Sequence, residues 1–196
     1  PNVGPFVGRQ LIQRLVTSNP SPAYIARVAA VFNNNGSGVR GDLRAVVSAI
    51  LLDTEARAPA ASTSYGKQRE PVIRFANFLR AFNARAASGR NAIHYLEDAD
   101  NGLGQSPLLA PSVFNFFSPF YAPPGVISDQ GLVAPEMQLA TEFLNTQVTN
   151  FFWTQALNRT QVQGSVATFN ADLMYIDTTA ERGIAADSEA LINRVA

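Results

Sequence analysis

Apolar residues recur at helical spacing along the first third of the chain. The spacing predicts helices over residues 5–17, 23–32 and 43–57, with arginine and glutamine on their opposite faces. The sequence NNNGSG, residues 33–38, ends the second of them. In the third segment the apolar positions expected on one face are Val46, Val47, Ile50 and Leu51. The length and phase of the three segments predict a small helical bundle over residues 1–57.

Three helix starts carry residues that cap helices. Ser21 stands before Pro22, Asp42 stands before the third predicted helix, and Asp187 stands before a final helix over residues 188–196. Short side-chain oxygens at these positions accept hydrogen bonds from backbone N–H groups of the first turn, and proline is favoured at the first helical position. These signals set the predicted starts of the helices.

The rest of the chain predicts two further helices around a long irregular region. A helix is expected over about 70–87 and the longest one over 135–157, with residues 88–133 irregular between them. The buried face expected for the first of these helices consists of Ile73, Phe75, Phe78, Leu79 and Phe82. The pattern therefore predicts an all-α, bundle-like fold.

The small polar residues 58–66 read as a connector. We expect one helical domain over residues 1–196, a fragment of a longer protein. Its natural subdivision would be a three-helix unit, 1–57, and a remainder, 67–196.

One segment of the irregular region is unusually aromatic. The aromatic segment, PSVFNFFSPFYAPPG, covers residues 111–125 and has four prolines and no charge. Its five rings are Phe114, Phe116, Phe117, Phe120 and Tyr121. Two interpretations stay open: a rigid segment packed into the protein's own core against the 135–157 helix, or a platform on which a ligand stacks.

The composition excludes several classes of function. Lysine plus arginine equals aspartate plus glutamate, 15 each, so no net field attracts nucleic acid. The absence of cysteine excludes disulfides, thiolate catalysis and zinc sites built on sulfur. No apolar stretch is long enough to span a membrane, and no motif for a nucleotide or another cofactor occurs. Because residue 1 is Pro1, the lack of a leader says nothing about the compartment.

Several phrases of the chain resemble one bacterial family. They are PNVGPFVGRQLIQRLVTSNPSPAYIARVAAVF, GVRGDLRAVVSAILLDTEAR, GKQREPVIRF, LGQSPLLAPSVFNFFSPFY and LVAPEMQLATE. Their order and wording are similar to the C-terminal part of the family catalogued as domain of unknown function 1800. The resemblance implies that an N-terminal portion is missing and that the protein is exported from a bacterium. It supplies no catalytic residues, because no activity is settled for that family.

Two carboxylates are candidates for chemistry. Glu70 and Glu136 each stand beside a proline at a helix start, where a negative charge complements the helix dipole. Two carboxylates facing one cleft would suit acid–base hydrolysis of a glycoside. The structural alternative pairs these acids with Arg9, Arg69 or Arg74. Glu142 is a third candidate acid for such chemistry.

The run HYLEDADNG, residues 94–102, offers weaker candidates. Asp98 and Asp100 could hold calcium, but the run lacks the ligand register of a calcium loop, so a solvated turn is preferred. His94, the only histidine, could act as a base, although a lone histidine beside apolar neighbours more often has no chemistry.

Two classes of function follow from these residues. The first is a helical scaffold or interaction domain that binds a polysaccharide or another exported protein. The second is a hydrolase that uses Glu136 and Glu70. The sequence indicates no cofactor and leaves the oligomeric state open.

Overall fold

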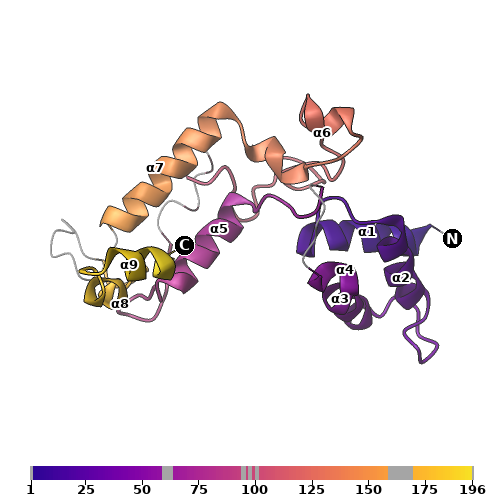
Figure 1. Ribbon diagram of the computed structural model, residues 1–196, viewed down its shortest axis with the longest axis horizontal. Helices are drawn as coiled ribbons and strands as arrows, with labels where there is room; N and C mark the ends of the chain where they lie inside the picture. Colours follow the sequence, from indigo (N-terminus) through magenta and orange to yellow (C-terminus); the bar gives the residue numbers. More distant parts are fainter. Residues whose placement is uncertain are drawn as a thin grey trace. The chain divides into compact units, whose positions relative to one another are not determined.

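The protein is described by a computed structural model in which the regular secondary structure of the described residues is helical, apart from isolated bridges (Figure 1). The residues described are 2–58, 64–93, 96, 99, 102–158 and 170–195. The helices are α1 (Val3–Leu15), α2 (Pro22–Asn33), α3 (Leu43–Leu52), α4 (Thr54–Arg57), α5 (Pro71–Ala81), α6 (Val126–Asp129), the 3-10 helix η1 (Pro135–Leu139), α7 (Glu142–Asn158), α8 (Thr179–Gly183) and α9 (Ser188–Val195). The all-α prediction is confirmed. Among the described residues, no helix is both long and apolar enough to cross a membrane.

The chain forms two compact units, and each unit combines two separate stretches. Unit 1 consists of Pro1–Gln68 and Ser112–Leu139, and unit 2 consists of Arg69–Pro111 and Ala140–Ala196. The subdivision expected at residues 58–66 stays a prediction. What the structure adds is that most of the aromatic segment belongs with the first three helices.

The predicted caps are confirmed. The side chain of Ser21 accepts a hydrogen bond from Tyr24 N at 3.1 Å, and that of Asp42 accepts one from Ala45 N at 3.1 Å. At the last helix, Asp187 accepts from the backbone of the first turn. These bonds satisfy N–H groups that have no partner inside the helix.

The core of unit 1 lies between α1, α2 and α3. Its fully buried members are Ile12, Tyr24, Val28, Val46 and Ile50. Gly8 lets α1 and α2 approach closely, because a Cβ there would lie only 3.1 Å from the Cγ1 of Val28. Leu51, which was expected on the buried face, is exposed, since it lies about 100° round the helix from Ile50.

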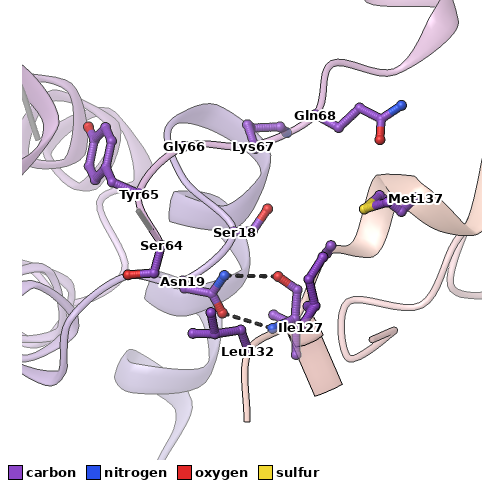
Figure 2. Close-up of a pocket in the computed structure, with 12 residues that line it drawn as sticks. Ser18, Asn19, Ser64, Tyr65, Gly66, Lys67, Gln68, Ile127, Leu132 and Met137 are labelled. Carbon is purple, nitrogen blue, oxygen red and sulfur yellow. Dashed lines mark hydrogen bonds between the residues drawn. The ribbon is translucent and has the colours of Figure 1, made fainter. Parts of the chain in front are cut away.

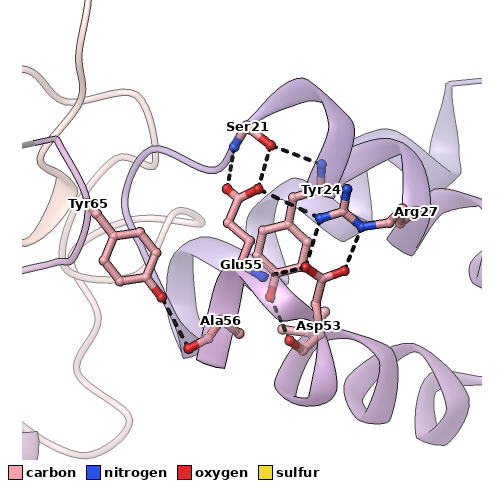
Figure 3. A network of polar contacts seen from close by, with 8 residues as sticks. Ser21, Tyr24, Arg27, Asp53, Glu55, Ala56 and Tyr65 are labelled. Atoms are coloured by element: carbon pink, nitrogen blue, oxygen red, sulfur yellow. Dashed lines mark hydrogen bonds and ion pairs between the residues drawn. The ribbon is translucent and has the colours of Figure 1, made fainter. Parts of the chain in front are cut away.

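A polar network ties α2 to the segment that follows α3 (Figure 3). Ser21 donates to both carboxylate oxygens of Glu55, through its backbone N at 2.9 Å and its hydroxyl at 2.6 Å. Arg27 donates two hydrogen bonds to Asp53, at 2.7 and 2.8 Å. The hydrogen bonding from Arg27 holds the pKa of the Asp53 carboxyl below its usual value. The network therefore holds the start of α4 against α2.

Tyr24 is the polar member of this core. Its side chain is fully buried, and its hydroxyl donates to the Ile50 carbonyl at 2.6 Å. Burial, followed by the negative charge of Asp53, raises the pKa of Tyr24 to about 12. The fold thus favours the protonated hydroxyl.

The core of unit 2 is aromatic. The rings of Phe75 and Phe151 meet edge to face, with centroids 4.9 Å apart, and Phe152 lies against Phe75 at 5.8 Å. The buried members are Phe75, Leu79, Leu103, Phe151 and Ile176. The burial expected for Ile73 is wrong: it is exposed, because it lies about 200° round the helix from Phe75.

Two predicted helices are shorter than expected. The helix expected over 70–87 ends at Ala81, and Asn83 follows in the left-handed region, with φ of 47°. The helix expected over 135–157 is interrupted: η1 ends at Leu139, and α7 begins after Thr141, whose hydroxyl accepts from Leu144 N at 3.2 Å. The interruption coincides with the boundary between the two units.

Replacing Tyr24 by Phe tests the buried hydroxyl. We expect the free energy of unfolding at neutral pH to fall by about 1 kcal/mol, because the Ile50 carbonyl loses its donor. The pKa of Tyr24 is about 12 in the folded protein against the usual value of 10.0, so its stabilisation is complete below pH 10 and is lost as the pH rises through 12. Tyr24→Phe should remove that part of the alkaline loss. Urea denaturation followed by circular dichroism at neutral and alkaline pH measures both effects, and an equal alkaline loss in the two proteins would contradict the assignment.

Candidate functional site

The aromatic segment is fixed to α1 at its centre. Phe117 is only 3% exposed, and the guanidinium of Arg14 lies over its ring at 4.1 Å. The side-chain amide of Gln13 donates to the Pro119 carbonyl at 3.3 Å. Both residues of α1 lie in its last turns, so this end of the helix holds the segment in place.

Two other rings of the segment face solvent. Phe114 and Phe120 are 57% and 55% exposed, whereas Phe116 and Tyr121 are partly buried. The two interpretations of the segment therefore apply to different rings. Phe117 packs into unit 1, and Phe114 and Phe120 are available to a ligand.

The serines of the segment stabilise turns. The Ser112 hydroxyl accepts from Phe114 N at 3.1 Å and donates to the Asn115 carbonyl at 3.2 Å. The Ser118 hydroxyl accepts from Phe120 N at 3.3 Å, and the Ser118 backbone N donates to Gln138 of η1 at 2.8 Å. The hydroxyl bonds give both serines a structural role in the turns, and the bond to Gln138 shows that the segment contacts the start of the predicted 135–157 helix.

Glu136 forms a buried ion pair with Lys67. Its carboxylate is 2% exposed, and its Oε1 lies 2.6 Å from Lys67 Nζ. The same ammonium donates to the Gln13 and Arg14 carbonyls, both at 3.0 Å. Three acceptors match the three donors of an ammonium group. The arginine partner expected for Glu136 is thus replaced by the only lysine of the chain, a compact charge that three converging oxygens suit better than a planar guanidinium.

The burial of Glu136 bears on the hydrolase hypothesis. A general acid or base must come within hydrogen-bond reach of the substrate. One oxygen of Glu136 is occupied by Lys67, and the other is buried with no hydrogen-bond partner in the described part of the chain. This geometry favours a structural role for the carboxylate.

Glu70 belongs to unit 2 and has a partner there. Its Oε2 accepts from the amide of Gln105 at 2.7 Å, and Gln105 in turn accepts from Val72 N at 3.2 Å. The buried Gln105 therefore caps the first turn of α5, and Glu70 orients its amide. Glu142 is exposed in the first turn of α7. Since Glu70 and Glu136 lie in different units, each is accounted for within its own unit.

The remaining candidates fall outside the described residues. His94, Asp98 and Asp100 are among them, so their predicted roles stay predictions. Within the residues that the structure does describe, no group of three or more acidic or histidine side chains is placed to hold a metal ion.

A cavity of about 340 Å³ opens in unit 1 (Figure 2). It lies between the turn after α1, the residues that lead into α5, and the stretch around α6 and η1. Its lining residues are Ser18, Asn19, Ser64, Tyr65, Gly66, Lys67, Gln68, Ile127, Leu132, Val133, Ala134 and Met137. The amide of Asn19 closes one wall by donating to the Val133 carbonyl and accepting from Val133 N, both at 2.9 Å.

Sequence reasoning missed polar residues that organise each unit. Gln13 and Lys67 in unit 1, and Gln105 in unit 2, carry no functional motif, and each bonds to a residue far away in the chain. One signal was present for Lys67: it is the single lysine among basic residues that are otherwise arginine.

A double-mutant cycle on the buried pair measures its coupling. Lys67→Met should lower the free energy of unfolding by about 3 kcal/mol, because Glu136 would remain as an unpaired buried charge. Adding Glu136→Leu should recover most of this loss, since both charges are then gone. Arg90→Gln, in the exposed pair of Arg90 with Asp172, is the control and should cost no more than about 0.5 kcal/mol. Urea denaturation of the wild type, Lys67→Met, Glu136→Leu and the double variant gives the four values of the cycle, and strictly additive losses would refute the coupling.

The two kinds of ring should respond differently to truncation. Phe117→Ala should lower the free energy of unfolding by about 3 kcal/mol, because it leaves a cavity under Arg14. Phe114→Ala should change it by less than about 0.5 kcal/mol, since that ring is exposed. Thermal and urea denaturation test both, and similar losses for the two variants would contradict the assignment of Phe117 to the core.

Comparisons with known proteins give the same family as the sequence phrases. The family model described as "Protein of unknown function (DUF1800)" matches residues 1–194. No curated protein and no solved structure matches the chain. The match covers unit 1 and unit 2 alike, and the chain belongs to the DUF1800 family of proteins of unknown function.

Proposed function

We propose that this chain is a non-catalytic interaction domain that binds a partner protein through unit 1. The docking surface consists of Phe6, Arg9 and Phe120. One observation carries the proposal: two large rings from distant parts of the chain, 56% and 55% exposed, converge on one arginine. Arg9 lies over the Phe120 ring at 5.6 Å, and Phe6 precedes Arg9 by three residues on α1, which places them side by side on the helix surface.

The residue types favour a protein partner over a polysaccharide. Aromatic residues and arginine are enriched where binding energy concentrates in protein interfaces. Val3, one turn before Phe6 on α1, is also exposed, as is Val113 in the aromatic segment. A sugar ring stacks on an aromatic face but gains little from exposed valines, whereas a protein interface buries both.

The docking surface is held in shape before binding. Phe117 and Pro119, three residues and one residue before Phe120, are both buried, and the Pro119 carbonyl accepts from Gln13. A surface that is already ordered loses less entropy when a partner binds. The hydrolase alternative has no comparable support, because Glu136 is buried in its ion pair.

The cellular setting is part of the proposal and rests on the family resemblance. We place the domain outside the cytoplasm of a bacterium, within a longer exported protein. Fractionation of the source cells with an antibody against this chain tests it, and recovery of the protein only from the cytoplasm would contradict it.

Photo-crosslinking tests the docking surface. A benzophenone amino acid is placed at Phe120 in one protein and at Leu43, an equally exposed position on α3, in another. Irradiation in an extract of the source cells should give a discrete protein adduct from position 120 and none from position 43. Phe6→Ala should abolish the adduct without changing the free energy of unfolding by more than about 0.5 kcal/mol.

Two results would overturn the proposed partner. Equal adducts at both positions, or none at position 120, would contradict a docking surface at Phe120. Retention of the purified chain on soluble or insoluble glycans, lost in Phe120→Ala, would replace the protein partner by a polysaccharide.

A further inference from the structure

We propose that the cavity in unit 1 is a binding site for a small uncharged ligand that carries an aliphatic group next to an amide or hydroxyl. None of its lining residues belongs to the docking surface, so the inference does not depend on the proposed function. Its volume, about 340 Å³, lies at the lower end of the range for ligand pockets, which sets the size at about one blocked amino acid.

Ser18 supplies the polar group at the base of the cavity. The residue is 4% exposed, and its backbone is fixed on both sides: its N donates to the Gly66 carbonyl at 2.9 Å, and its carbonyl accepts from Gln13 at 3.0 Å. Its hydroxyl has no hydrogen-bond partner within the described part of the chain and points into the cavity (Figure 2). The hydroxyl is open to solvent within the cavity, so a ligand that bonds to it replaces water there.

The cavity offers a ligand no unpaired charge. Lys67 lines it, but all three N–H groups of its ammonium are taken by Glu136, Gln13 and Arg14. An anionic ligand would therefore have to break the buried ion pair. A neutral ligand leaves that pair intact.

The opposite side of the cavity is aliphatic. Ile127, Leu132 and Met137 line it, and the polar atoms of Asn19 are already bonded to Val133. Gln68 stands exposed at the rim, and its side-chain amide has no partner among the described residues. An aliphatic wall opposite the Ser18 hydroxyl, with the Gln68 amide at the rim, fits a ligand that carries an aliphatic group next to an amide or hydroxyl.

N-acetyl-L-leucinamide is the probe. We expect saturation-transfer NMR to detect its binding to the whole chain, with a dissociation constant on the order of 1 mM for a ligand of this size. Backbone amide shifts should move at Ser18, Leu132 and Met137. N-acetyl-L-leucine, which differs by a carboxylate, should bind at least several-fold more weakly.

Ser18→Ala separates ligand binding from folding. It should weaken binding by about tenfold through the lost hydrogen bond, while the midpoint of thermal unfolding stays the same. Ser37→Ala, at an exposed serine, is the control and should change neither. Leu132→Gln, which makes the aliphatic wall polar, should also weaken the probe.

Three results would overturn the site. They are an absence of shifts at the cavity residues, unchanged affinity in both Ser18→Ala and Leu132→Gln, and equal or tighter binding of N-acetyl-L-leucine. Tighter binding of N-acetylglucosamine than of the leucine amide would overturn the aliphatic class of ligand.

Discussion

The ion pair between Lys67 and Glu136 is the contact on which the arrangement of unit 1 depends. Removing two charges from water costs several kcal/mol for each ion, so a buried pair persists only where further hydrogen bonds satisfy it. Here the carbonyls at the end of α1 provide them. One ammonium group thereby joins the end of α1, the residues that lead into α5, and η1. The ion pair constrains the geometry of unit 1, because all three of these segments must reach the Lys67 ammonium group.

The Lys67–Glu136 ion pair also constrains the docking surface and the neighbouring cavity. The aromatic segment leads through α6 to η1, so fixing Glu136 fixes the far end of the chain that presents Phe120. The same pair leaves the neighbouring cavity without a free charge. Burial of the carboxylate thus disfavours chemistry at Glu136 and at the same time defines what kind of ligand the region can accept.

Local signals in the sequence predicted most of the helices. Ser21, Asp42 and Asp187 mark helix starts because a cap depends on residues three positions away, and such spacing is visible in one sequence. The family was also visible, since its phrases extend over much of the chain. The early end of α5 at Ala81 was not predicted, although Asn83 is a residue type that tolerates the left-handed conformation after a helix, because the apolar spacing continues to Phe82.

Contacts between distant residues were not predictable in this way. Lys67 meets Glu136, and Gln105 caps α5, only because the fold brings separate stretches together. The exposure of Phe114 and the burial of Phe117 likewise depend on where α1 lies, since both residues read alike in the sequence. The aromatic composition was therefore enough to locate the candidate site, but which ring is buried and which is exposed could not be predicted from it.

The interleaved order of the two units has a consequence for biosynthesis. The ribosome makes residues 69–111, which belong to unit 2, before it makes the second stretch of unit 1. At a synthesis rate of about 5–20 residues per second, Glu136 is made several seconds after Lys67. During that interval the nascent helices α1 to α3 lack the segment that covers the end of α1, and apolar surface there is open to chaperones. Neither unit can be completed by the growing chain before part of the other exists. No single cut separates the two units: a cut after Gln68 divides unit 1 and leaves unit 2 whole, whereas a cut after Leu139 divides unit 2 and leaves unit 1 whole.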